Sequence, residues 1–123
     1  GVDVIDCSSG GLTEETRALP VPRGLGFQVP FSERIRHGAN VPTQAVGMIV
    51  DAVQAEAVLQ EGKADLIALG REALFDPYWA HHAAGALGMD SNYQRWPIRH
   101  GIWLAKRAPG LARARAEAAE QQS

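Results

Sequence analysis

A short apolar run that ends in a glycine and a cation is the part of this sequence best suited to chemistry. Residues 66–69 are apolar, Gly70 and Arg71 follow, and the next residues favour a helix. Glycine lets a backbone N–H approach an oxyanion, and a helix N-terminus carries partial positive charge. A guanidinium can grip phosphate oxygens in a bidentate way. This order of features predicts a phosphate-binding turn.

A second glycine strengthens this prediction. Gly47 lies near the end of the apolar run 43–49, one strand and one helix earlier in the chain. Taken alone, Gly47 is more typical of close packing, and Arg71 is a natural ion-pair partner of Glu72 or Asp76. Together, Gly47, Gly70 and Arg71 indicate two neighbouring strand ends that share one phosphate.

The elements that must position these residues alternate along the chain. We expect strands over residues 2–7, 43–49 and 65–69, separated by a loop over 12–29 and by helices. The first helix, about 31–38, follows Pro30 and turns Phe31 and Ile35 inward. The second begins at Asp51, buries Val53, Ala57 and Val58, and ends near Gly62. A helical turn over 71–75 and a helix from Asp76-Pro77 to about 87 complete the pattern.

This β–loop–α–β–α–β–α order predicts an α/β fold with a parallel sheet covered by helices. Three such units cannot close a (β/α)₈ barrel, which needs about 250 residues. The chain also starts at Gly1 and enters a strand at once. We therefore expect residues 1–88 to be the C-terminal part of a longer (β/α)₈ barrel and residues 89–123 to be a tail.

Composition argues against several classes of partner. The net charge is −2, so no strong basic field attracts nucleic acid. No apolar run approaches the roughly 20 residues of a membrane span, and the single cysteine excludes an internal disulfide. The sequence predicts a soluble, cytoplasmic protein with no nucleic-acid or membrane partner. Cys7 is expected to be a buried strand residue, and no histidine has partners at metal-ligand spacing.

With these elements placed, the sequence resembles the Old Yellow Enzyme family of FMN-dependent ene-reductases, in particular its thermophilic-like bacterial subgroup. Four pieces in family order carry the resemblance: residues 4–11 (VIDCSSGG), 26–31 (GFQVPF), 45–49 (AVGMI) and 64–72 (ADLIALGRE), the last continued by 76–79 (DPYW). The resemblance implies a TIM barrel of which these are strands six, seven and eight.

The resemblance also implies roles for individual residues. Gly47, Gly70 and Arg71 would contact the FMN phosphate, and Ser8 and Ser9 would add a hydroxyl or a backbone amide to the phosphate or ribityl chain. The family's catalytic groups lie on earlier strands, so no residue of this chain is given a catalytic role. The adjacent His81 and His82 fall in the last outer helix, which is the wrong place for substrate binding.

The tail resembles the subgroup as well, because there the C-terminal residues of one subunit reach a neighbour's active site. The candidates for this role are Arg95, Trp96, Arg99 and Trp103, which implies a homo-oligomer, a dimer or tetramer. Residues 105–123 are rich in Ala, Arg, Glu and Gln and form either a solvated helix or a frayed tail.

These inferences point to an FMN-dependent oxidoreductase that uses NADPH or NADH to reduce activated alkenes. This chain would supply the phosphate site and would be inactive alone. Two alternatives stay open. One is another phosphate-binding (β/α)₈ enzyme without flavin, and the other is a non-catalytic half-barrel that only self-associates.

Overall fold

The computed structural model describes residues 1–10, 12–15 and 24–121. Gly11, and Pro20 and Pro22 of the predicted loop, lie outside the described residues. The chain divides into two compact units, Gly1–Trp79 and Ala80–Ser123. The first unit contains the predicted sheet, and each unit is described by itself below.

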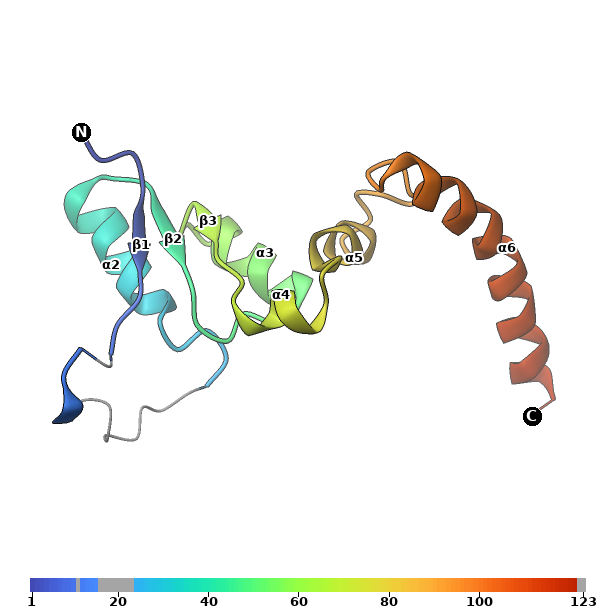
Figure 1. Cartoon of the computed structure of the whole chain (residues 1–123), viewed down its shortest axis with the longest axis horizontal. Coiled ribbons are helices and arrows are strands. Elements are labelled where there is room, and N and C mark those ends of the chain that lie inside the picture. The colour runs from blue at the N-terminus through green and yellow to red at the C-terminus, as the bar shows by residue number, and fades with distance from the viewer. Residues whose placement is uncertain (11, 16–23, 122–123) are drawn as a thin grey trace. The chain divides into compact units, whose positions relative to one another are not determined.

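The sheet of the first unit has three parallel strands in the order β1-β2-β3 (Figure 1). They are β1 (Ile5–Cys7), β2 (Thr43–Ala45) and β3 (Leu66–Ile67). The predicted strand order and direction are confirmed, but the strands are shorter than predicted. Strand β2 ends early because Gly47 and Met48 have positive φ angles of 113° and 51°, which are incompatible with extended backbone.

Helices follow each strand, and local sequence explains where they begin and end. They are α2 (Val29–Ala39), α3 (Ala52–Gln60), α4 (Arg71–Phe75) and α5 (Trp79–Ala86). Pro30 lies in the first turn of α2, and the Asp51 carboxylate caps α3 by accepting the Gln54 N–H at 2.8 Å. Gly62, with a φ of 69°, lets the Lys63 N–H reach the Val58 oxygen and so ends α3.

The predicted buried faces of α2 and α3 are confirmed at Val58, which is buried, and wrong at Phe31 and Val53. Phe31 is 44% exposed and Val53 is 68% exposed, whereas α2 buries Val29 and Ser32. Ser32 can be buried because its hydroxyl is shared between the backbone oxygens of Val29, at 2.8 Å, and Lys63, at 3.0 Å. On α3 the buried residues are Ala52, Ala55 and Val58, whose small side chains let the helix approach the sheet closely.

The core of this unit lies on one face of the sheet. Ala45 of β2 faces the helices there. It packs with residues of α2, α3 and the adjoining loops, which are Val29, Ile49, Ala55, Val58 and Ala64. The opposite face carries no helix within the described residues. Across it, the Gln44 amide donates to the Asp6 carboxylate at 2.9 Å, and Leu66, next in register, is exposed.

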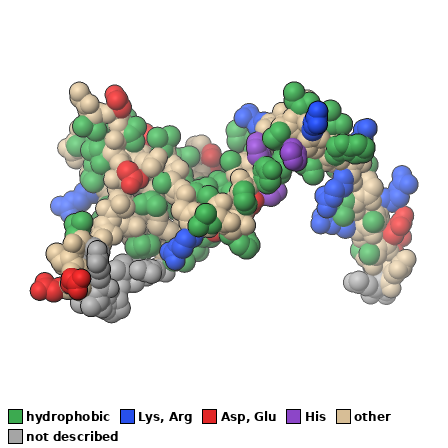
Figure 2. Space-filling model, in the orientation of Figure 1, with side chains coloured by type: hydrophobic (Ala, Val, Ile, Leu, Met, Phe, Trp, Pro, Cys, Tyr) green, Lys and Arg blue, Asp and Glu red, His purple; other side chains and the backbone are tan. Residues whose placement is uncertain are grey.

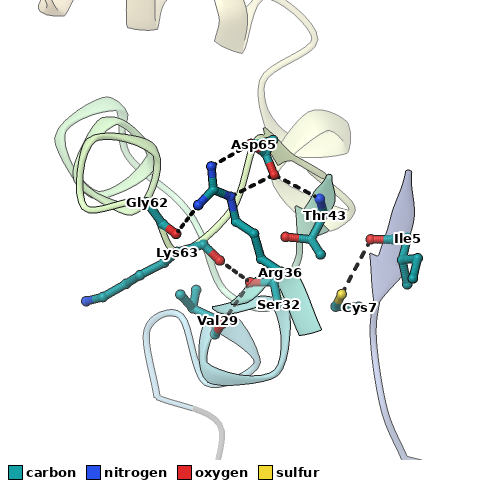
Figure 3. Close-up of polar contacts among 9 residues, drawn as sticks. All are labelled: Ile5, Cys7, Val29, Ser32, Arg36, Thr43, Gly62, Lys63 and Asp65. Carbon is teal, nitrogen blue, oxygen red and sulfur yellow. Dashed lines mark hydrogen bonds and ion pairs between the residues drawn. The ribbon is translucent and has the colours of Figure 1, made fainter. Parts of the chain in front are cut away.

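A polar clamp joins the elements at the ends where β2 and β3 begin (Figure 3). Arg36 of α2 donates from Nε and Nη2 to the Asp65 carboxylate, at 2.9 and 3.0 Å, and from Nη1 to the Gly62 oxygen at 3.1 Å. Asp65 also accepts the Thr43 N–H at 3.0 Å. The hydrogen bonds from Arg36, and then that from Thr43, hold the pKa of Asp65 below its ordinary value.

The second unit contains the rest of α5 and the long helix α6 (Ile98–Glu120). The solvated-helix alternative for the tail is therefore the one the structure adopts. Figure 2 shows Lys and Arg side chains over α6, and its cations Lys106, Arg107, Arg113 and Arg115 are all exposed. Among the described residues, no helix is both long and apolar enough to cross a membrane.

Candidate functional site

The predicted phosphate-binding residues line one cavity. Gly47 follows β2, while Gly70 and Arg71 follow β3, and all three belong to the wall of a cavity of about 390 Å³. Because β2 and β3 are parallel and paired, their carboxyl ends lie side by side and bring these residues together. This is the end of the sheet opposite the Arg36–Asp65 clamp.

Gly47 has a structural reason to be glycine. Its φ of 113° is a conformation that other residues rarely adopt. A Cβ built at this position would lie 3.0 Å from the Phe27 ring and 3.1 Å from two atoms of the Gln28 side chain. Gly47 therefore lets the backbone of the cavity wall pass directly against the residues that precede α2.

Gly70 and Arg71 differ from Gly47 in being open to solvent. A Cβ at Gly70 would meet no atom within 4 Å. Within the described part of the chain Arg71 makes no ion pair, so the predicted alternative of pairing with Glu72 or Asp76 is not observed. Helix α4 has only five residues, so its dipole contributes little, and the guanidinium is the main positive charge at the cavity.

The loop that carries Gly47 is held by a glutamine that the sequence analysis did not single out. The Gln54 side chain donates to the Met48 oxygen at 2.9 Å and accepts the Val50 N–H at 2.9 Å. On its other side, the indole N–H of Trp79 donates to the Val50 oxygen at 2.9 Å. These hydrogen bonds fix the backbone of one cavity wall before any ligand binds.

Gln28 was also missed as a site residue. It precedes α2, lines the cavity and is only 7% exposed. Its Oε1 accepts a short hydrogen bond from the Ser9 N–H. The signal was present, since Gln28 belongs to the sequence piece 26–31, but an uncharged side chain far from Gly70 in sequence does not indicate an anion site.

Ser8 and Ser9 do not line the cavity. Both are exposed, and the backbone amide of Ser9 is engaged by Gln28. Ser9 is thus joined to the cavity through the Gln28 carboxamide. Neighbouring Cys7 is buried, as predicted, and burial, followed by the charge of Asp6, raises the pKa of its thiol.

In the second unit, three of the four tail candidates line a groove of about 340 Å³. These are Trp96, Arg99 and Trp103, whereas Arg95 contributes only its backbone N–H to a hydrogen bond with Asp90. Trp103 is 70% exposed, with Lys106 Nζ 4.8 Å from its ring centroid. The structure therefore groups three of the four candidates within the second unit.

In the second unit, two histidine rings of α5 pack against Trp96. The ring of His81 stacks on it at 4.8 Å between centroids, and His82 lies at 5.3 Å. Gly101 lets α6 pack against the backbone of Tyr93, because a Cβ there would lie 2.5 Å from the Tyr93 oxygen. Among the described residues, no group of three or more His, Cys, Asp or Glu is arranged to hold a metal ion.

The wall of the cavity thus combines glycine backbone with a guanidinium that makes no ion pair with the described residues. The sequence was also compared with known proteins. Residues 2–89, which include the sheet and the whole cavity wall, match the model of the NADH:flavin oxidoreductase / NADH oxidase family. The described part of helix α6 lies beyond the matched region.

The curated relatives that this chain is similar to are named NADPH dehydrogenases. The chain is 50% identical over 88 residues to an NADPH dehydrogenase of Halalkalibacterium halodurans, covering 72% of this chain and 25% of the relative. It is 50% identical over 91 residues to an NADPH dehydrogenase of Bacillus subtilis, covering 73% and 25%. The chain spans about a quarter of the length of these relatives. The resemblance to Old Yellow Enzymes is thereby confirmed, and the chain belongs to the NADH:flavin oxidoreductase / NADH oxidase family.

Proposed function

We propose that this chain supplies the FMN phosphate site of an FMN-dependent NAD(P)H oxidoreductase that reduces activated C=C bonds. The observation that carries the proposal is the shared cavity of Gly47, Gly70 and Arg71 at two adjacent strand ends. Family membership supports a flavin as the ligand, and a phosphate is the part of FMN that such a cavity can hold.

The residues present fit a phosphate. The guanidinium of Arg71 has no carboxylate partner among the described residues, so its N–H groups are available to phosphate oxygens. A Cβ built at Gly70 would meet none of the described atoms within 4 Å, so the space beside this backbone is open to a ligand. Gly47 contributes the facing wall, and the hydrogen bonds of Gln54 and Trp79 hold that wall in place.

The exposed sheet face supports a larger fold around this site. We propose that β1, β2 and β3 are strands six, seven and eight of a TIM barrel, in which phosphate commonly lies beyond strands seven and eight. The outer edges of β1 and β3 are unpaired within the described residues, and the face with Asp6, Gln44 and Leu66 carries no helix. Both features suit a sheet continued by further parallel strands.

Bound FMN would supply hydride transfer, with NADPH or NADH as reductant and an activated alkene as substrate. The part of this chain in that chemistry is to bind and orient the cofactor through its phosphate. In the same proposal, the protein is a homo-oligomer. The groove residues Trp96, Arg99 and Trp103, or Arg95 beside them, then reach a neighbouring subunit's active site.

The test uses the complete gene product that carries residues 1–123, titrated with FMN and with riboflavin, which lacks the phosphate. Wild-type protein is expected to bind FMN much more tightly than riboflavin. Arg71→Ala should weaken FMN binding ~10- to 100-fold and leave riboflavin binding unchanged, and Arg71→Lys should fall between. Arg34→Ala, on an exposed position of α2 outside the cavity, is the matched control.

Three outcomes would contradict the proposal. Equal affinity for FMN and riboflavin would mean that no phosphate site operates. A colourless protein that binds a sugar phosphate would instead favour a (β/α)₈ enzyme without flavin. A protein that binds neither and only self-associates in light scattering would favour the non-catalytic half-barrel.

A further inference from the structure

Gln28 is a buried polar side chain in the wall of the cavity, and neither its charge nor its position in the sequence marks it as a ligand. We propose that Gln28 is a second phosphate-binding side chain, whose Nε2 donates a hydrogen bond to the anion that Arg71 holds. This inference rests on the proposed phosphate site and adds a neutral donor to it from a third segment of the chain.

The orientation of the Gln28 carboxamide follows from its one hydrogen bond to the described residues. The backbone N–H of Ser9 can only donate, so the atom that faces it must be the acceptor Oε1. The Nε2 group must then point the other way. This assignment depends on a backbone donor, and so it does not rely on distinguishing oxygen from nitrogen in the side chain.

The other end of the carboxamide lies against Gly47. Nε2 is 3.1 Å from the position that a Cβ of Gly47 would occupy, so the amide rests directly on the glycine backbone of the cavity wall. Among the described residues, Nε2 donates to no acceptor. A side chain more than nine-tenths buried thus presents two N–H donors without an acceptor at the edge of the cavity.

Nε2 is not sealed off from solvent, because the buried side-chain atom that lacks a hydrogen-bond partner among the described residues is Thr43 Oγ1 and not this nitrogen. Water or a ligand in the cavity can therefore accept its hydrogen bonds. A phosphate oxygen is a strong acceptor and needs no counter-charge from the amide, because Arg71 supplies the charge. This arrangement also explains why Gly47 must lack a Cβ. A methyl group there would push the carboxamide out of the position in which it contacts both Ser9 and the cavity.

The same geometry couples the three strand ends. Ser9 follows β1, Gly47 follows β2, and Gly70 and Arg71 follow β3, while Gln28 bonds to the first and contacts the second. Loss of the anion would therefore leave Nε2 to water but would keep the Ser9 hydrogen bond. Gln28 is in this way both a ligand and the link through which the β1 loop is held at the site.

The test is to substitute Gln28 in the complete gene product and to measure FMN, riboflavin and inorganic phosphate binding. Gln28→Glu keeps the size and the Oε1 acceptor but brings a negative charge, so FMN affinity should fall at least ~10-fold while riboflavin affinity is unchanged. Gln28→Met removes the donors without adding charge and should give a smaller loss. Inorganic phosphate should compete with FMN less well in both variants.

Gln60→Glu makes the same change in charge on an exposed position of α3 outside the cavity and should leave all three affinities unchanged. If wild type discriminates FMN from riboflavin and the Gln28 variants retain that discrimination, Gln28 is not a phosphate ligand. If both flavins lose affinity equally in the Gln28 variants, its role is only to support the fold. If the wild-type protein binds FMN and riboflavin equally well, the proposed phosphate site is itself wrong, and the proposal for Gln28 falls with it.

Discussion

The indole N–H of Trp79 donates a 2.9 Å hydrogen bond to the backbone oxygen of Val50. Trp79 begins α5, and Val50 lies in the loop between β2 and α3 that carries Gly47. Trp79 also packs against the core of the first unit. Trp79 therefore both packs against the core and holds one wall of the cavity that contains Gly47.

Trp79→Phe should loosen this wall without emptying the core. The ring is retained in large part, but the Val50 oxygen loses its donor, so we expect a loss of about 0.5–1.5 kcal/mol in the free energy of unfolding. FMN affinity should also fall, because the Gly47 loop is less well held. Urea unfolding and FMN titration measure the two effects. Phe75→Leu changes an aromatic residue at an exposed position of α4 outside the cavity and should alter neither.

The two glycines of the cavity should respond differently to alanine. Gly47→Ala combines a positive φ with 3.0–3.1 Å contacts to Phe27 and Gln28, and should destabilise the protein by about 1–3 kcal/mol. In Gly70→Ala the new methyl group meets none of the described atoms within 4 Å, so the variant should fold as wild type does. The methyl group adds to the cavity wall, however, and should weaken FMN binding.

Thermal unfolding of both glycine variants measures the effect on stability, and FMN titration measures the effect on binding. Gly85→Ala in α5 is the control, since a Cβ there also meets nothing and Gly85 is outside the cavity. Normal FMN binding by Gly70→Ala would mean that the ligand does not approach the backbone at this position.

The clamp between Arg36 and Asp65 predicts a defined acid dependence of stability. The folded-state pKa of Asp65 is lowered, chiefly by the hydrogen bonds from Arg36. The carboxylate therefore stabilises the fold at pH values above its ordinary pKa of about 4, and this stabilisation is lost as the pH falls through the lower folded value. Asp65→Asn should be less stable than wild type at pH 7 and should show a weaker decline below pH ~4.

Urea unfolding measured from neutral to acid pH tests this prediction. Asp3→Asn removes an exposed carboxylate that makes no ion pair with the described residues, and it should keep the wild-type pH profile. An Asp65→Asn profile parallel to that of wild type would show that the clamp does not contribute through its charge.

Cys7 should be slow to react with iodoacetamide in the native protein. It is 3% exposed, and burial, followed by Asp6, raises the pKa of its thiol, so little reactive thiolate is present near pH 8. We expect alkylation of Cys7 to be at least ~10-fold slower in the folded protein than in urea. Mass spectrometry of the peptide that contains Cys7 gives both rates, and equal rates would contradict its burial.

Local sequence determined most of the elements and their order. Asp51 and Gly62 begin and end α3 through interactions within a few residues, which is why its predicted boundaries agree closely with the structure. The prediction that the next long helix begins at Asp76-Pro77 is wrong: α5 begins at Trp79, because Asp76 ends α4 and its carboxylate accepts the Tyr78 N–H at 3.0 Å. The parallel order of β1, β2 and β3 follows from helical connections that return the chain in one direction. Gly47, Gly70 and Arg71 could be paired in advance because adjacent parallel strands end at the same edge.

The buried faces of the helices and the position of Gln28 in the cavity wall depended on tertiary structure. Ser32 is buried in place of Phe31 because its hydroxyl finds the Lys63 oxygen, 31 residues away in sequence. Gln28 becomes a cavity residue only because Ser9, 19 residues earlier, orients its amide and Gly47 leaves room for it. A glutamine has the same chemistry wherever it lies in a sequence. Which of its two ends faces a ligand is decided by the partner that the folded chain brings to the other end.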